Sequence, residues 1–316
     1  MKMIVTLLHK EQIQTTMKKL LLFAATAGLL FSACQKDESS NPLSDSNSSA
    51  NKTYTPPTTG SVSPVPSSFL KKAMVEEFVG TQVAAAPEAS FDLESIVKGS
   101  NDRVYAASLH VSDDMSTFQT PRVLSMMGNS NPTLPCGIIS RQGYNGQIFF
   151  NSKQFNGALN TLLNKPVDCG LAITSVVLVK RIIASIHYGF TATMPGTYKV
   201  TAYLIEDKVQ SNNPIFDQAN AFNNNPNSIF YQAGNPIKSY QHRYIVRNTL
   251  TAPTGNAINP AANIPGGSDI ISLQFDMPGK YSAIGNYKIL CFLTDAATNE
   301  VVNVQQADIG TTKDWN

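Results

Sequence analysis

The stretch AMVEEFVG at residues 73–80, followed by TQVAAAP at residues 81–87, decides the fold. Its first part carries Val and Phe side chains on both sides of Glu76 and Glu77, which predicts a strand. Pro87 suits the first turn of a helix, and apolar residues then recur at helical spacing until Gly99 can end it. A strand, a short loop and a helix are therefore predicted in that order.

Three further elements are predicted before residue 166. Residues 104–111 form a second strand, and a third strand is expected at residues 122–127. Residues 151–164 carry apolar side chains at i, i+3, i+4, i+7 and i+8, the pattern of an amphipathic helix. Asn151 and Gln154 can cap this helix, and Pro166 stops it.

This order, with Thr120-Pro121 before the third strand, resembles a thioredoxin-like domain. The phrase EEFVG at residues 76–80 resembles the lead-in to a Cys-x-x-Cys-Pro loop in the 28-kilodalton outer-membrane lipoprotein family. In that register the cysteines fall on Val83 and Ala86, the proline on Pro87, and Pro121 takes the place of the cis-proline. Thiol–disulfide exchange needs an attacking and a resolving thiol. The resemblance therefore implies a redox-inactive scaffold without catalytic residues.

After Pro166 the hydrophobic period changes from helical to twofold, which predicts an antiparallel immunoglobulin-like β-sandwich. The predicted strands cover residues 172–179, 182–193, 198–204, 240–251, 270–276, 287–294 and 300–308. The predicted fold class is thus α/β plus all-β, with a degenerate thioredoxin-like domain at 69–166 and the sandwich at 167–316. The resemblance to the lipoprotein family covers roughly residues 70–310, and includes YLIED at 203–207 and HRYIVR at 242–247.

The N-terminal residues predict a lipoprotein. Residues 1–33 combine a leader with a signal peptide whose twelve-residue apolar run, 20–31, is too short to span a bilayer. Translation is predicted to begin at Met17, because the basic residues and the apolar run of a complete signal peptide follow it directly. Small residues before Cys34 resemble a bacterial lipobox, which implies cleavage there and a membrane anchor on its sulfur. Residues 34–68 form a disordered Ser- and Asn-rich tether.

Directly after Cys34 come Gln35, Lys36, Asp37 and Glu38. They resemble the tag that sends lipoproteins of one Gram-negative phylum to the outer face of the outer membrane. The sequence therefore predicts display at the cell surface, with the periplasmic face as the alternative. The 24 Lys and Arg nearly balance the 22 Asp and Glu, which excludes a strongly basic nucleic-acid binder.

Three cysteines remain beyond the anchor. Cys136 and Cys169 lie 33 positions apart in an exported protein, and they either form a disulfide or stay free. Cys291 lies on the apolar face of an alternating strand, which favours a buried inert thiol.

Polar residues at the ends of predicted strands form a second candidate site. Glu206, Asp207, His242 and Arg247 are either a structural cluster that ties strand ends together or a metal or ligand site. No second histidine is spaced to share a metal, which favours the structural interpretation.

The Asn-rich insert at residues 211–236 is a candidate contact loop, because long loops are often functional. Its aromatic residues are Phe216, Phe222, Phe230 and Tyr231, and these either contact a partner or pack on the sandwich.

We therefore expect a non-catalytic outer-membrane lipoprotein that binds a protein, peptide or glycan, or supports a surface assembly. We expect no metal, no cofactor and no nucleic acid. One alternative is a periplasmic-facing, chaperone-like lipoprotein that binds peptides. Another is an unorthodox redox helper that uses Cys136 and Cys169 as its thiols.

Overall fold

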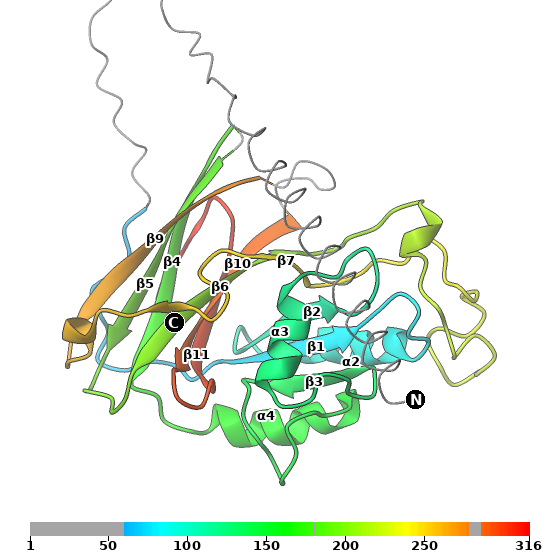
Figure 1. The fold of residues 1–316 in the computed structure, drawn as a ribbon, viewed down its shortest axis with the longest axis horizontal. Helices are drawn as coiled ribbons and strands as arrows, with labels where there is room; N and C mark the ends of the chain where they lie inside the picture. The colour runs from blue at the N-terminus through cyan, green and yellow to red at the C-terminus, as the bar shows by residue number, and fades with distance from the viewer. Residues whose placement is uncertain (1–59, 180, 278–285) are drawn as a thin grey trace, which may run out of the picture. The chain divides into compact units, whose positions relative to one another are not determined.

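The computed structural model of the chain describes residues 60–179, 181–277 and 286–316. Strand β1 (Ala73–Val79) is buried along its whole length. It pairs in parallel with β2 (Val104–His110) and antiparallel with β3 (Cys136–Ile139). Helix α2 (Ala86–Gly99) connects β1 to β2, which confirms the strand and helix predicted from the opening stretch (Figure 1).

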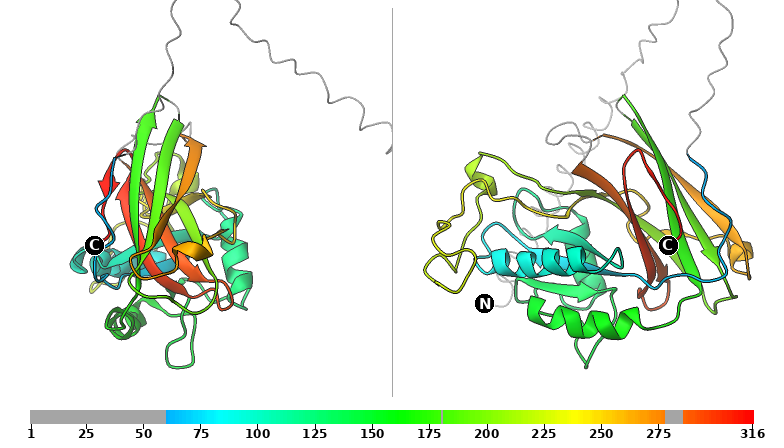
Figure 2. Two further views of the ribbon diagram at one scale, coloured as in Figure 1. Left: turned by 90° about the vertical axis from the view of Figure 1, so that its left-hand side faces the viewer. Right: turned by 180° about the vertical axis from the view of Figure 1, so that it is seen from behind.

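Helices cover both faces of this part of the sheet. Helix α4 (Phe155–Leu163) follows the short 3-10 turn η1 (Ser152–Gln154), and the predicted capping box of Asn151 and Gln154 is present. Figure 2 shows α2 and α4 side by side on one face, and α3 (Gln119–Met126) lies on the other (Figure 1).

The expected third strand at residues 122–127 is wrong, because these residues belong to α3. The buried residues of this segment are Gln119, Thr120, Val123 and Leu124, which is helical rather than alternating spacing. Pro121 lies in the first turn of α3, where proline is tolerated. It is therefore not a cis-proline; the cis peptide bonds of the described residues are Leu134–Pro135, just before β3, and Asn235–Pro236.

The sheet continues through both predicted domains. Strand β2 pairs in parallel with β7 at Ser108 and Ile245, and the eight-stranded sheet has the order β11-β10-β6-β7-β2-β1-β3, with β8 paired to β6. Its remaining strands are β6 (Tyr198–Glu206), β7 (Ile245–Thr249), β8 (Asn256–Ala257), β10 (Tyr287–Asp295) and β11 (Val301–Asp308).

A second, four-stranded sheet has the order β12-β4-β5-β9. It consists of β4 (Cys169–Leu178), β5 (Arg181–Phe190), β9 (Ser268–Asp276) and β12 (Thr312–Lys313). Two short 3-10 turns, η2 (Pro214–Phe216) and η3 (Pro260–Ala262), complete the described elements. The fold is thus a mixed α/β structure in which sheets dominate.

Strands β6 and β10 contribute to two hydrophobic cores at once. Val200 and Leu204 pack into the cluster between the two sheets, whereas Tyr203 and Ile205 pack into the cluster under the helices. In the same way Cys291 of β10 packs into the cluster between the two sheets, and Phe292 packs into the cluster under the helices. Because successive strand residues point to opposite faces, both faces of these strands are covered. The two halves of the chain therefore share their central strands.

Most of the N-terminal predictions lie outside the described residues. They concern Met17, Cys34, the tag residues Gln35, Lys36, Asp37 and Glu38, and the predicted tether up to residue 59. The end of the predicted tether is wrong, because residues 60–68 contact the C-terminal segment, where the Trp315 indole N–H donates to the Ser63 carbonyl at 2.8 Å. In the part of the chain that the structure describes, no helix is both long and apolar enough to cross a membrane.

Candidate functional site

The loop between β1 and α2 carries the positions at which the family resemblance places two cysteines. Val83 is half-buried there and Ala86 is buried. The backbone folds tightly, because the Val83 N–H donates to the Gly80 carbonyl at 3.0 Å and the Ala86 N–H donates to the Val83 carbonyl at 2.9 Å. Pro87 follows inside the first turn of α2. Neither Val83 nor Ala86 has a side chain that can ionise or attack a disulfide.

The Asn-rich insert lies directly on this loop. The Ala219 N–H donates to the Thr81 carbonyl at 2.8 Å, and the Ala221 N–H donates to the Ala84 carbonyl at 2.8 Å. In Figure 1 the insert is the yellow-green segment beyond the end of β1 and the start of α2. The backbone groups of the loop are therefore paired with another part of the same chain.

Gln218 is the central side chain of this contact, and it is only 2% exposed. Its Nε2 lies 3.1 Å from the carbonyl oxygens of Thr81 and Val83 and 3.3 Å from that of Gly80. Each of these carbonyls also accepts a backbone N–H, so the Gln218 amide supplies a second donor to oxygens that can accept two hydrogen bonds. We call residues 218–221 together with the loop at 80–86 the sealed loop.

The aromatic residues of the insert divide between the two expected roles. Phe216 is buried, and the Phe230 ring packs edge-on against Phe91, with 6.5 Å between ring centroids. Phe222 is half-buried. Tyr231 is 43% exposed, so it remains available for a contact. Most of these rings thus hold the insert in place.

The predicted polar cluster contains two ion pairs at the strand ends. Arg247 pairs with Glu206, and Asp207 accepts two hydrogen bonds from Arg243, at 2.7 and 3.0 Å. Burial alone would raise the pKa of Asp207, but the hydrogen bonds and charge of Arg243 hold it below its usual range. Arg243 also pairs with Glu94 of α2. These contacts tie β6 to the segment before β7 and to α2, and their central cation, Arg243, was not part of the predicted cluster.

His242 belongs to a different group of side chains. Its Nε2 donates to the Phe216 carbonyl at 2.8 Å, and its ring lies 5.4 Å from that of His110, whose Nδ1 is 2.7 Å from Asp113. Burial, together with His110, lowers the pKa of His242 to about 4. A neutral His242 thus fixes the start of the insert.

Sequence reasoning missed a buried ion pair in the middle of β1. Arg141 donates to both carboxylate oxygens of Glu76, at 2.8 Å each, and the Tyr203 hydroxyl donates to Glu76 at 2.9 Å. Arg141 is 4% exposed and Glu76 is fully buried. The signal was the pair of adjacent acidic residues inside a buried strand, since each must find a partner on its own face of the sheet.

Glu77 points to the opposite face of β1 from Glu76. It accepts hydrogen bonds from the hydroxyls of Ser108, at 3.0 Å, and of Ser90 in α2, at 3.1 Å. Burial raises the pKa of Glu77 to about 7. This carboxyl group is therefore a second polar feature of the core that sequence reasoning did not single out.

All three described cysteines are free and buried, so of the two alternatives for Cys136 and Cys169 the structure has the free thiols rather than the disulfide. The reason is their placement: Cys136 packs in the core under the helices, whereas Cys169 packs between the two sheets. Burial raises the pKa of both thiols to about 12. Cys291 is buried as predicted.

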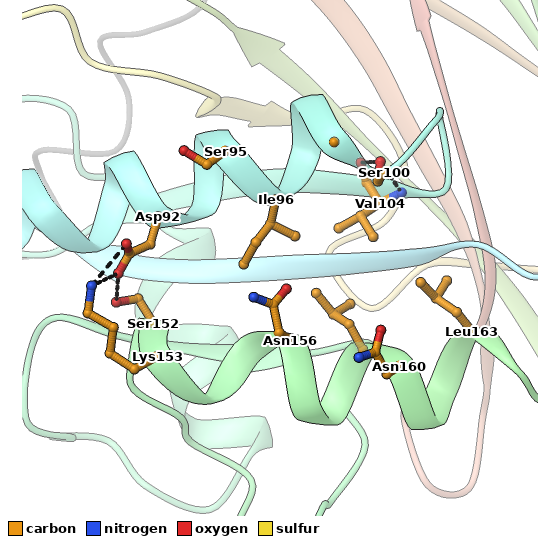
Figure 3. A pocket seen from close by; sticks show the side chains of 12 residues that line it. Asp92, Ser95, Ile96, Ser100, Val104, Ser152, Lys153, Asn156, Asn160 and Leu163 are labelled. Carbon is orange, nitrogen blue, oxygen red and sulfur yellow. Dashed lines mark hydrogen bonds and ion pairs between the residues drawn. The ribbon is translucent and has the colours of Figure 1, made fainter.

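A groove of about 510 Å³ separates α2 from α4 (Figure 3). Its walls carry hydroxyl and amide side chains from both helices, and the buried side chains of Val104 and Leu159 form part of its floor. At one end Asp92 pairs with Lys153 at 2.8 Å and accepts from the Ser152 hydroxyl at 2.6 Å. No motif marked this groove in the sequence, because its polar residues look like an ordinary solvated helix face.

The described ranges hold no group of three or more His, Cys, Asp and Glu side chains placed to bind a metal ion. The only titratable residues that line the groove are Asp92 and Lys153, which already pair with each other.

One solved structure shares the fold. The structure is similar to HBP35 of Porphyromonas gingivalis, with a TM-score of 0.57 and 18% identity over 77% of this chain and 76% of that one. Weaker similarity, at a TM-score of 0.46 and 11% identity, links 76% of this chain to 95% of a protein from Agrobacterium tumefaciens. A domain of the outer membrane lipoprotein Omp28 from Porphyromonas gingivalis gives a TM-score of 0.30 and 13% identity, over 48% of this chain and 92% of that one.

No curated protein sequence matches the chain. Residues 129–313, however, match the family described as outer membrane protein Omp28. The match covers more than half of the 316 residues and includes the predicted polar cluster and the insert. The chain therefore belongs to the Omp28 family of outer membrane proteins.

Proposed function

We propose that this protein is a non-catalytic outer-membrane lipoprotein that binds a partner or supports an assembly at the cell surface. In this proposal residues 69–166 are a thioredoxin-like scaffold without redox chemistry, and residues 167–316 are an immunoglobulin-like sandwich. The parallel β1–α2–β2 unit with an antiparallel β3 supports the first assignment. The two facing sheets support the second.

The sealed loop is the observation that carries the proposal. An oxidoreductase must bring an exposed thiolate to the disulfide of its substrate. Here Val83 and Ala86 offer no sulfur, and Gln218 and Ala219 cover the backbone that a substrate would approach. The same cover counts against the chaperone-like alternative in which an extended peptide binds at this loop, because the chain's own insert already holds that place.

The redox-helper alternative is disfavoured by the surroundings of the two thiols. With a pKa of about 12, each of Cys136 and Cys169 holds only about one thiolate in 10⁵ molecules at pH 7. The two side chains also lie in different hydrophobic clusters, so they cannot serve as attacking and resolving thiols for each other.

Thiol–disulfide exchange by the purified protein tests this part of the proposal. We expect the native chain to reduce or oxidise a fluorescent glutathione disulfide no faster than buffer. The variants Cys136→Ser and Cys169→Ser serve as matched controls. Exchange that is faster than buffer and is lost in either variant would show that the protein is a redox enzyme.

The proposed location rests on Cys34 and on the tag residues Gln35 to Glu38, which resemble a surface-export signal. In this proposal the lipid at Cys34 holds the protein at the membrane. Protease treatment of intact cells separates surface display from a periplasmic location.

A further inference from the structure

The groove between α2 and α4 has the features of a binding site that none of the motifs in the sequence marked. Its volume of about 510 Å³ lies within the range of sites that hold small ligands and peptide segments. It lies between two helices on one face of the sheet (Figure 2). It is also distinct from the sealed loop, whose residues do not line it.

The amides of Asn156 and Asn160 face the groove from α4 (Figure 3). Both residues are exposed, and their side chains make no hydrogen bond among the residues that the structure describes. Each amide carries both a donor and an acceptor. A ligand that offers both kinds of group at a regular spacing would therefore satisfy both side chains.

The spacing of these amides fits an extended polypeptide. Residues four apart in a helix are separated by about 6 Å along its axis. Alternate residues of an extended chain are separated by about 6.6–6.8 Å, and each exposes one backbone N–H and one C=O. Asn156 and Asn160 can thus bond to alternate residues of the same peptide backbone.

The opposite wall leaves room for such a chain. Gly99 of α2 lines the groove, and a Cβ atom built on it would meet no atom within 4 Å. Ile96 points from α2 into the groove and supplies apolar contact (Figure 3). The α4 side of the groove runs from Lys153 to Leu163, a length of about 15 Å at the rise of a helix. An extended chain of four to five residues has the same length.

The charge of the groove favours a backbone over a charged ligand. Asp92 and Lys153 are the charged residues that line it, and they neutralise each other at 2.8 Å. No aromatic side chain lines the groove to stack on the face of a sugar ring, which disfavours a glycan.

We propose that the groove between α2 and α4 binds an extended peptide segment of four to five residues, largely through its backbone. This proposal rests on the proposed binding function and names its site and the class of its partner. The occupant is a segment of another protein rather than a free small molecule, because the amides of Asn156 and Asn160 lie on two successive turns of α4, a spacing that one extended backbone can reach.

A photo-cross-linking experiment tests the groove. The probe is a pool of acetylated, amidated hexapeptides with random sequence and a central benzoylphenylalanine, mixed with the full mature chain in detergent micelles. We expect the cross-links, mapped by mass spectrometry, to fall on α2 and α4 near Ile96 and Asn156. Cross-links that are absent, or that map outside the two helices, would overturn the proposal.

Two variants give the experiment its specificity. The double variant Asn156→Ala/Asn160→Ala removes four possible hydrogen bonds, and we expect about tenfold weaker cross-linking. Gly99→Tyr fills the groove and should reduce cross-linking at least as much. Lys98→Tyr places the same ring on the exposed neighbouring position and should change nothing. Equal cross-linking in all variants would contradict the assigned site.

A parallel set of oligosaccharides of similar length separates the two proposals. If a glycan binds in the groove and Gly99→Tyr abolishes it while hexapeptides do not bind, the peptide assignment is wrong but the binding function stands. If instead the purified chain shows cysteine-dependent disulfide exchange, the proposed function itself fails.

Discussion

Replacing Gln218 with Leu should open the sealed loop without unfolding the protein. Leu keeps the apolar part of the side chain but removes the amide whose Nε2 lies near the carbonyl oxygens of Gly80, Thr81 and Val83. An amide nitrogen has two N–H groups, so about two good hydrogen bonds are lost at once. The three carbonyls keep their backbone donors, the N–H groups of Val83, Ala219 and Ala86, so none is left without a partner.

The size of the effect follows from these two bonds. A hydrogen bond whose loss leaves no group unsatisfied contributes about 1 kcal/mol to stability, so the loss of two costs about 2 kcal/mol in total. Because about 1.4 kcal/mol is a factor of ten, the open form of the contact should become roughly 30-fold more populated. The amides of Ala219 and Ala221, which donate to the loop, report on this opening directly.

Hydrogen exchange measured residue by residue is the assay. Exchange at Ala219 and Ala221 should accelerate by about 30-fold, while amides in the middle of β1 should change much less, because local opening does not require global unfolding. Gln82→Leu is the control, since Gln82 lies in the same loop but is exposed. Wild-type exchange rates at Ala219 and Ala221 in the Gln218→Leu variant would refute the assigned role of this side chain.

Two further predictions concern the acidic pair of β1. Arg141→Met should destabilise the protein by about 3–5 kcal/mol, because Glu76 is left buried without its cation, and the double variant Glu76→Met/Arg141→Met should recover part of that loss in chemical denaturation. Burial raises the pKa of Glu77 to about 7 from its usual 4.5, so the free energy of unfolding should fall by about 3 kcal/mol as pH rises from 4.5 to above 7. Glu77→Gln should flatten this dependence, and an unchanged pH profile would contradict the assignment.

Local signals in the sequence predicted the local structure well. The run at residues 73–80 became β1, Pro87 lies in the first turn of α2, and the Asn151 and Gln154 caps are present as expected. Each of these features depends on contacts between residues that are close in the sequence, so the sequence alone is enough to predict it. The prediction of a strand after Pro121 was wrong, because a Thr-Pro pair is found both before strands and at the start of helices. Only the burial of Val123 and Leu124 against the sheet decides between the two.

Features that depend on distant contacts were not predictable. Gln218 lies 138 positions from Gly80, so nothing near it in the sequence indicates that it covers the loop. Strand β6 was expected to alternate between apolar and polar faces, yet both Leu204 and Tyr203 are buried, because the helices cover one face and the second sheet covers the other. The groove between α2 and α4 exists only once the two helices lie side by side.

Protease treatment of intact cells, followed by detection of the folded fragment, tests the central claim that this is a binding protein displayed outside the cell. The wild-type chain should be released while a periplasmic control protein stays uncut. A Lys36→Ser/Asp37→Ser/Glu38→Ser variant should instead be protected, because the tag is removed and the lipid at Cys34 remains. If the wild-type chain is cut only after the outer membrane is opened, surface display is wrong and the partner must be sought in the periplasm.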